Sequence, residues 1–410
     1  MGKESLKIYI VGAGISGLIA AKTLEENGFS TILLEATDTT GGRVKTDVKN
    51  GIFYDHGFQV LLTDYPQAKK HLDYKKLQLH HFKPGALIFK AGKTERIGDP
   101  LRDLSVFWPT LRANVGSLSD KFRIYNLTRK LKAKSISDIF SEDETTTMDY
   151  LKAYGFSDAI IVNFFKPFFT GIFLEEELKT SSRLFEFVFK MFGEGYAAVP
   201  VKGIGQMAQQ LSGNLLRSQV QFQTKVTRVS GQEVKLANGT LLKADAIIST
   251  LPLNEKGEIA AQEIFWKSCD NLYFTVEKKT FETGIIGLVA NDDTLTNNLY
   301  YLFEQELNGD PVLSVTVVKK HQKSESELVK AVTEELEKEC GIRIKTFLRN
   351  YHIKRALPDI SNLGMQPKSE GLKNKQGVYL AGDHMLSGSL NAAMVSGEAA
   401  AKAVINDLKP

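Results

Sequence analysis

The first 43 residues hold the pattern that most restricts the fold of this chain. An apolar segment runs into Gly12, Gly14 and Gly17, which have the GxGxxG spacing, and an alanine-rich helical pattern follows. A second apolar segment, residues 31–34, ends in Glu35, eighteen residues after the last of these glycines. Glycine permits a tight turn and a close backbone approach to a pyrophosphate, a helix N-terminus offers unpaired N–H groups, and an acid accepts ribose hydroxyls. The pattern predicts a βαβ unit that binds a dinucleotide.

A second nucleotide-binding element is predicted near the other end of the chain. An apolar run there ends in Gly382 and Asp383, and a helix of small residues begins near Asn391. Beside the first element, Arg43 closes a Gly-Gly-Arg sequence. A nicotinamide enzyme needs no second element of this kind, whereas an extended FAD needs an acid for its ribityl chain and a helix N-terminus near the flavin ring. The sequence therefore predicts FAD.

These motifs occur in the order found in a known family. Together with residues 53–57, 200–205 and 244–252, they make the chain resemble the flavin amine oxidase superfamily, which also contains protoporphyrinogen oxidase and the phytoene-desaturase-like enzymes. The resemblance implies a fold of class α/β. It consists of a two-dinucleotide-binding, Rossmann-like FAD domain and a discontinuous α+β substrate domain that carries a helical subdomain.

The resemblance also implies roles for individual residues. The glycine loop would hold the pyrophosphate, Glu35 the adenosine ribose and Asp383 the polyol chain, while Arg43 would neutralise the phosphates and Val226 would contact adenine through its backbone. The predicted cofactor-binding residues are Gly12, Gly14, Ile15, Ser16, Gly17, Glu35, Ala36, Gly42, Arg43, Val226, Gly382, Asp383, Asn391 and Ala392.

The segments assigned to FAD are scattered along the chain, which predicts a discontinuous domain. The FAD domain is expected to comprise residues 1–75, 200–255 and 355–410. The substrate domain is expected to comprise residues 76–199 and 256–354, with its helical part at 100–195. Strand patterns in the FAD domain lie at 220–229, 233–237, 240–242 and 246–250. In the substrate domain, strand patterns for an antiparallel sheet lie at 271–277, 284–290, 298–303, 311–318 and 346–352, with an amphipathic helix at 325–340.

Composition limits the classes of protein to consider. A chain of 410 residues, 42% hydrophobic and 24% charged, predicts a soluble globular protein of two domains. The net charge of +4 gives no reason to propose nucleic acid. Two cysteines, Cys269 and Cys340, indicate a reducing, cytoplasmic location, and neither lies near the C-terminal flavin element, so FAD is expected to be non-covalent. We predict no signal peptide, no membrane-spanning segment and no metal site.

Residues 100–195 combine aromatic and basic side chains. Ten of the 24 phenylalanines lie between Phe156 and Phe192, where they either line an apolar cavity or pack a helical core. We expect some of them at the cavity. Residues 121–134 carry six basic side chains, but on a helical wheel Phe122 and Tyr125 fall almost opposite the leucines of the same segment. Because a membrane-surface helix has one apolar face, we expect a solvated helix and keep peripheral membrane contact as the alternative.

Catalytic groups are harder to predict than cofactor groups, because the flavin itself carries the chemistry. Members of the amine oxidase branch often place a lysine near flavin N5, and Lys278 and Lys279 lie in the corresponding region. The same branch commonly has an aromatic residue before the C-terminal helix, where this chain has Ser389, as in the carotene-desaturase branch. His56 is a further candidate to face the flavin, with a structural role as the alternative.

The leading hypothesis is an FAD-dependent oxidoreductase. It would remove two hydrogens from an apolar or amphipathic organic substrate by hydride transfer to flavin N5, with oxygen or a quinone-like compound as the electron acceptor. Three alternatives remain: an amine oxidase, an isoprenoid or carotenoid desaturase or isomerase, and a non-catalytic lipid-binding escort protein on the same fold.

Overall fold

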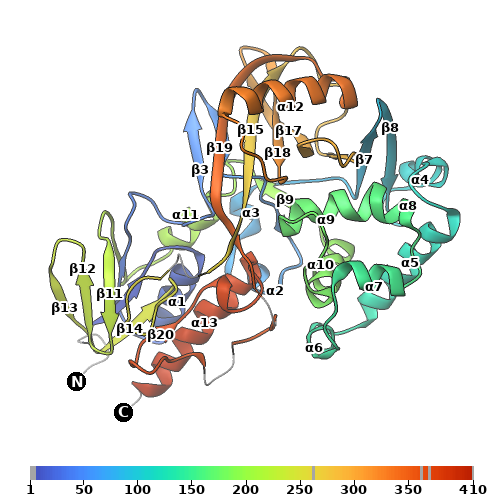
Figure 1. Ribbon diagram of the computed structural model, residues 1–410. Helices are drawn as coiled ribbons and strands as arrows, with labels where there is room; N and C mark the ends of the chain where they lie inside the picture. Colours follow the sequence, from blue (N-terminus) through green and yellow to red (C-terminus); the bar gives the residue numbers. More distant parts are fainter. Residues whose placement is uncertain (1–5, 261–263, 361–362, 368–370, 409–410) are drawn as a thin grey trace.

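The computed structural model describes residues 6–260, 264–360, 363–367 and 371–408. One of its sheets is parallel, and its strands in spatial order are β10 (Gln219–Gln221), β2 (Thr31–Leu34), β1 (Ile8–Val11), β14 (Ala246–Ser249) and β20 (Tyr379–Leu380). The helices α1 (Ile15–Glu26) and α13 (Leu390–Asp407) pack against each other beside this sheet (Figure 1). Segments from both ends of the chain therefore build one layer. We call it the nucleotide-binding layer, because the motifs assigned to nucleotide binding lie in it.

A three-stranded antiparallel ribbon extends from this layer. It contains β11 (Val226–Ser230), β12 (Glu233–Leu236) and β13 (Leu241–Lys243), and a turn with Gly239 at φ +88° joins the last two. The prediction of one strand at 220–229 is wrong. Gln223 has a left-handed backbone (φ +53°), so the chain turns there, and β10 joins the parallel sheet while β11 joins the ribbon.

The largest sheet has seven strands and belongs to the other half of the molecule. In spatial order they are β19 (Ile344–Pro358), β15 (Trp266–Val276), β18 (Asp310–Val317), β17 (Thr296–Leu307), β16 (Ile286–Val289), β7 (Gly85–Lys90) and β8 (Lys93–Gly98). The sheet is antiparallel as predicted, except that β16 and β7 pair in parallel. The sequence analysis missed β7 and β8, and the helix predicted at 325–340 is α12 (Glu325–Cys340), whose Leu328, Val332 and Leu336 pack on this sheet.

Helices occupy the chain between β8 and residue 194. They are the turn η2 (Leu104–Val106), α4 (Phe107–Arg112), α5 (Leu118–Ala133), α6 (Ile136–Ser141), α7 (Thr147–Ala153), α8 (Asp158–Ile160), the π-turn η3 (Ile161–Phe165), α9 (Lys166–Phe173) and α10 (Ser182–Glu194). Phe165, Phe169 and Phe185 are fully buried among them. The aromatic stretch therefore serves chiefly as the core of this helical part.

Short elements connect the two sheets. They are β3 (Thr46–Lys49), β4 (Ile52–Asp55), β5 (Leu61–Leu62), α2 (Pro66–His71), α3 (Tyr74–Leu77), β6 (Leu79–His81), β9 (Ala197–Pro200), α11 (Gln206–Gly213) and η6 (Asp383–Met385). Among the described residues, no helix is both long enough and apolar enough to cross a bilayer.

Candidate active site

A cavity of about 1930 Å³ runs from the nucleotide-binding layer to the seven-stranded sheet. Typical small-molecule pockets measure about 300–1,000 Å³, so this cavity has room for a large cofactor and a second ligand. Its wall includes the turn after β1, the end of β2, the Gly-Gly-Arg loop, α10 and the segment before α13. Parts of the chain that are far apart in the sequence therefore meet at one site.

Eleven of the fourteen predicted cofactor-binding residues line this cavity. They are Gly12, Gly14, Ile15, Ser16, Glu35, Ala36, Gly42, Arg43, Val226, Gly382 and Asp383.

The other three, Gly17, Asn391 and Ala392, lie behind the wall. A Cβ atom at Gly17 would come within 2.1 Å of the carbonyl oxygen of Gly12, so this glycine lets α1 pack against the turn. The side chain of Asn391 accepts a hydrogen bond from the Gln67 N–H (3.1 Å). The Ala392 N–H donates a hydrogen bond (3.1 Å) to the hydroxyl of Ser389, the N-cap residue of α13. Ser389 thus has a structural task at the position where the amine oxidase branch has an aromatic residue.

The turn before α1 is open toward the cavity. The N-cap residue Gly14 provides no side chain for a capping hydrogen bond, and the first turn of α1 contains no acidic residue. A Cβ atom at Gly14 would find its nearest neighbour, the Gly41 carbonyl oxygen, only at 3.9 Å. The N-terminus of α1, with its first N–H groups and the positive end of the helix dipole, therefore faces the cavity, which fits a pyrophosphate.

Glu35 is held in place at the end of β2. One carboxylate oxygen accepts the Ala13 N–H (2.9 Å), and the other accepts the N–H (2.9 Å) and hydroxyl (2.8 Å) of Thr37. The residue is buried, yet it lines the cavity. A carboxylate oxygen has more than one lone-pair direction, so this fixed carboxylate can still accept hydrogen bonds from ribose hydroxyls.

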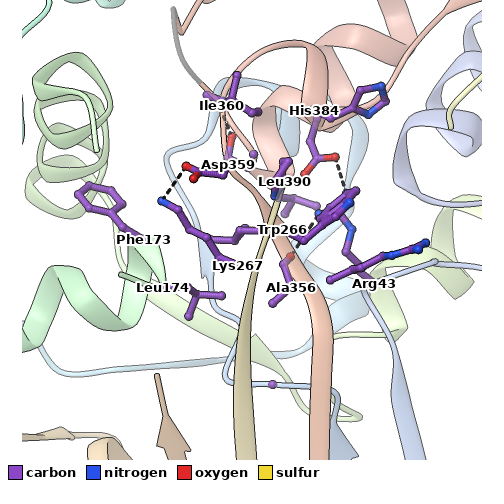
Figure 2. A pocket seen from close by; sticks show the side chains of 18 of the residues that line it. Arg43, Phe173, Leu174, Trp266, Lys267, Ala356, Asp359, Ile360, His384 and Leu390 are labelled. Carbon is purple, nitrogen blue, oxygen red and sulfur yellow. Dashed lines mark hydrogen bonds and ion pairs between the residues drawn. The ribbon is translucent and has the colours of Figure 1, made fainter. Parts of the chain in front are cut away.

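Arg43 and Asp383 form an ion pair inside the cavity (Figure 2). The Arg43 guanidinium also donates to the carbonyl of Ala356 (3.2 Å) and lies 5.2 Å from the ring centre of Trp266. Gly382, which precedes the acid, has φ +130°, and a Cβ atom there would clash with His384 at 2.2 Å. The glycine is therefore required for the turn that presents Asp383 to the cavity.

His56 lines the cavity, but the preceding residue, Asp55, does not. His56 Nε2 lies 3.1 Å from Asp47, its ring packs on Tyr351 at 4.2 Å, and burial lowers its pKa. Asp55 is buried and accepts hydrogen bonds from the Thr46 hydroxyl (2.5 Å) and the Ile204 N–H (2.9 Å). Burial raises the pKa of Asp55 to about 6. Asp55 therefore fixes the loops around the site and does not reach into it.

The two candidate lysines lie outside the cavity, whereas a cysteine lies in its wall. Lys278 and Lys279 are exposed beyond the end of β15, where Lys279 lies 3.9 Å from Glu306, and neither lines the cavity. Cys269 does line the cavity, which the sequence did not indicate. Burial raises the pKa of its thiol to about 12, so the thiol stays protonated near neutral pH.

The far end of the cavity has an apolar wall. Leu184, Val188 and Phe192 recur every four residues along α10 and form one stripe that lines the cavity. Ile286 and Leu288 of β16 also line it. Of the ten phenylalanines between residues 156 and 192, three line the cavity: Phe168, Phe173 and Phe192. Some of these rings therefore do reach the cavity, as expected.

Several residues of the cavity wall were not predicted from the sequence. Trp266 lies between Arg43 and Leu390 in Figure 2, and Phe173 and Leu174 lie on the opposite side of the view. Lys267 Nζ lies 3.6 Å from Asp359 and 3.3 Å from the Thr180 hydroxyl. These side chains come from separate segments with no shared spacing, so no sequence motif could have identified them.

Comparisons with known proteins agree with this geometry. Residues 15–405 match the family described as "Flavin containing amine oxidoreductase". The chain is 24% identical over 477 residues to 15-cis-phytoene desaturase of an Oncidium hybrid cultivar. This match covers 99% of this chain and 78% of that protein. It is 25% identical over 324 residues to L-amino-acid oxidase of Bungarus fasciatus. This match covers 72% of this chain and 62% of that protein.

The fold is also found among solved structures. A CLA-producing fatty acid isomerase from P. acnes superimposes with a TM-score of 0.70 over 100% of both chains, at 15% sequence identity. At that identity, the similarity shows the fold alone. The family match covers nearly the whole chain, and the chain therefore belongs to the flavin containing amine oxidoreductases, FAD-dependent enzymes of oxidation and reduction.

Proposed function

We propose that the protein binds FAD without a covalent link and removes two hydrogens from an apolar or amphipathic organic substrate. When bound, FAD supplies a two-electron acceptor whose N5 atom takes a hydride, and oxygen or a quinone-like compound would reoxidise it. We assign residues 1–75, 200–255 and 355–410 to the cofactor domain. Residues 76–199 and 256–354 are assigned to the substrate domain.

The cavity wall supports this placement of the cofactor. The open N-terminus of α1 would bind the pyrophosphate, and Glu35 would bind the ribose. Arg43 and Asp383, which form an ion pair in the same cavity, would contact the phosphates and the polyol chain. The protonated thiol of Cys269 is a poor nucleophile, because the thiolate is the reactive form, which favours non-covalent binding.

The apolar stripe on α10 is the observation that supports the substrate class. Leu184, Val188 and Phe192 line the cavity together with Ile286 and Leu288, so this apolar wall favours hydrocarbon. Each buried methylene contributes about 0.8 kcal/mol, so a long chain can bind tightly without any charged contact. The similarity to a phytoene desaturase favours an isoprenoid desaturase or isomerase within this class.

An amine oxidase is the second candidate, and one feature of the cavity favours it. Five acidic side chains lie along one part of the cavity wall: Glu144, Asp149, Glu175, Glu176 and Glu177. Acidic groups at a cavity mouth attract cations and raise their rate of entry. The similarity to an L-amino-acid oxidase points the same way. Against this candidate, Lys278 and Lys279 lie outside the cavity.

Anaerobic flavin reduction distinguishes the two candidates. The holoprotein is mixed with an isoprenoid series of increasing chain length and, separately, with common mono- and polyamines, while the flavin absorbance is recorded. We expect bleaching only with the apolar series, and an affinity that rises by up to about fourfold per methylene. Rapid bleaching by a short amine would establish the amine oxidase instead.

A pair of variants tests the role of the apolar stripe. Val188→Asp places a carboxylate in the apolar wall and is expected to weaken binding of the longest isoprenoid at least about tenfold. Val188→Leu keeps the wall apolar and serves as the matched control. Both variants should retain their FAD, because Val188 lies away from the glycine turn. Equal substrate binding by the two variants would show that the substrate does not contact α10.

A further inference from the structure

The helical part of the protein exposes an unusual number of apolar side chains. Sixteen large apolar residues are exposed in the described chain, and eight of them lie within the 25 residues from Leu101 to Tyr125. These eight are Leu101, Leu104, Phe107, Trp108, Leu111, Leu118, Phe122 and Tyr125, with exposed fractions from 39% to 82%. We call them the α4–α5 face. Exposed apolar residues scattered singly need no explanation, but a group of this size indicates an interaction surface.

Helix α5 shows how this face arises. Leu127 and Leu131 are fully buried and point into the helical core. Leu118, Phe122 and Tyr125 recur at i, i+4 and i+7, and at 100° per residue they lie on the opposite side of the helix. The helix therefore has two apolar sides, of which the protein itself covers only one. This explains why the helical wheel of residues 121–134 has no single apolar face.

The two helices of the face are joined to each other. The Lys121 ammonium of α5 donates to the carbonyls of Leu111 and Ala113 at the end of α4, at 2.8 Å each. The rings of Phe107 and Trp108 are in contact on α4 (5.2 Å between centroids). In Figure 1, α4 and α5 lie together at the outer end of the helical part. The Lys121 hydrogen bonds thus hold the start of α5, which carries Phe122, beside the end of α4.

Positive charge surrounds these rings. Residues 101–134 contain eight basic and two acidic side chains, a net charge of +6, whereas the entire chain carries +4. One of the eight, Lys134, is paired with Glu142 and Glu186 outside this segment. On α5, Arg129 and Lys132 continue the same side of the helix as Phe122 and Tyr125, and both are exposed. Arg129, Lys130 and Lys132 have no ion-pair partner among the residues that the structure describes. One of the two acids, Asp120, is buried and caps α5, so it does not offset this charge at the surface.

We propose that the α4–α5 face docks on a membrane surface that contains anionic lipids. Rings and leucines would enter the boundary between headgroups and acyl chains, and the arginines and lysines would contact the lipid phosphates, as in other interfacial helices. An apolar protein partner would account for the rings but not for the unpaired positive charge.

The position of the face suits an apolar substrate. Helix α10 separates it from the cavity: Leu184, Val188 and Phe192 line the cavity, while Lys190 of α10 donates to the carbonyl of Leu131 in α5 (2.9 Å). The docked enzyme would hold the apolar wall of its cavity near the bilayer, with α10 and α5 between them. The docking itself depends on the exposed side chains alone and would exist for any substrate.

Vesicle binding tests the proposal with the holoprotein. Flotation is measured with phosphatidylcholine vesicles and with vesicles that also contain phosphatidylglycerol. We expect strong binding only to the anionic vesicles, and weaker binding as salt is raised. The chain has two tryptophans, Trp108 and Trp266, so the fluorescence of the Trp108→Phe variant isolates the signal of Trp108 by difference. That signal should shift to the blue when anionic vesicles are added.

Paired variants separate the apolar and the charged contributions. Trp108→Ser with Phe122→Ser should weaken vesicle binding at least tenfold, and Arg129→Gln with Lys132→Gln about 30-fold, at about 1 kcal/mol for each basic residue. Leu216→Ser is the apolar control, because Leu216 is 90% exposed elsewhere. Lys330→Gln with Lys338→Gln on α12 is the charge control, since both lysines are exposed. All variants should keep their FAD content and melting temperature.

Two outcomes would overturn the proposal. One is vesicle binding that is equal in the wild type and in both α4–α5 variants. The other is a dimer, seen by light scattering, that Trp108→Ser with Phe122→Ser dissociates while the wild type does not bind vesicles. In that case the face would be an interface between two copies of the chain.

Discussion

The nucleotide-binding layer and the helical part place different demands on the amino-acid sequence. Around α1, the backbone itself must approach a ligand or a neighbouring element, so glycines are required at fixed positions. At Gly17, for example, a Cβ atom would come within 2.1 Å of the Gly12 carbonyl oxygen. Around α10, the protein needs apolar area, and several rings share that task. A backbone constraint leaves a signature at fixed spacing in the sequence, whereas apolar area leaves only a composition.

The largest effect is expected in the helical part, where two neighbouring rings have different tasks. Phe169 is fully buried among Phe165, Phe173 and Phe185, while the adjacent Phe168 lines the cavity. Phe169→Ala should lower the free energy of unfolding by about 3–5 kcal/mol, measured by urea denaturation. Phe168→Ala, the matched control, should cost less stability and change substrate affinity. The same loss of stability in both variants would show that Phe168 belongs to the core as well.

A second prediction concerns the close packing in the nucleotide-binding layer. Gly17→Ala brings a methyl group against the Gly12 carbonyl and displaces the turn, at a cost of about 1–3 kcal/mol. FAD affinity should fall at least about tenfold, measured by titration of the apoprotein. Gly213→Ala at the end of α11 has open space around it and should bind FAD normally. Normal FAD affinity in Gly17→Ala would show that the turn adapts to the methyl group.

The same division separates the elements that could be predicted from the sequence from those that could not. The strands and helix of the N-terminal unit were predicted because its glycines, apolar runs and acid lie within 43 consecutive residues. β19 extends from Ile344 to Pro358, but only 346–352 was predicted, because its half-buried residues show no clean alternation. Trp266 and Lys267 could not be identified at the cavity, because tertiary packing alone brings them to Arg43 and Asp359.

A third prediction concerns Glu35 and the ribose. Charge-assisted hydrogen bonds contribute about 1.5–3 kcal/mol, so Glu35→Ala should weaken FAD binding about tenfold or more. Because Glu35 also binds the Ala13 and Thr37 N–H groups, Glu35→Gln should lose less than Glu35→Ala. Glu26→Ala, which removes an exposed acid paired with Lys22, controls for the loss of charge. An unchanged dissociation constant for Glu35→Ala would restrict the acid to a structural role.

The last prediction concerns the pH dependence that the buried Asp55 imposes on the free energy of unfolding. Burial raises the pKa of Asp55 to about 6 in the folded protein, although hydrogen bonds from Thr46 and Ile204 oppose this, whereas an unfolded aspartate titrates near 3.8. Between these values the folded protein keeps a proton that the unfolded chain has lost. The contribution of Asp55 to the free energy of unfolding therefore falls as pH rises toward 6, by at most about 1.4 kcal/mol per pH unit.

Asp55→Asn isolates this contribution, because the asparagine oxygen can still accept the hydrogen bonds of Thr46 and Ile204 but does not titrate. Urea unfolding is measured from pH 4 to pH 7 with saturating FAD, and the free energy of the variant is subtracted from that of the wild type. We expect the difference to shift against the wild type as pH rises, and to level off above pH 6. A shift in favour of the wild type would mean that Asp55 is stabilised as a carboxylate. The Thr46 hydroxyl and the Ile204 N–H would then be held by a charged carboxylate rather than by a neutral acid.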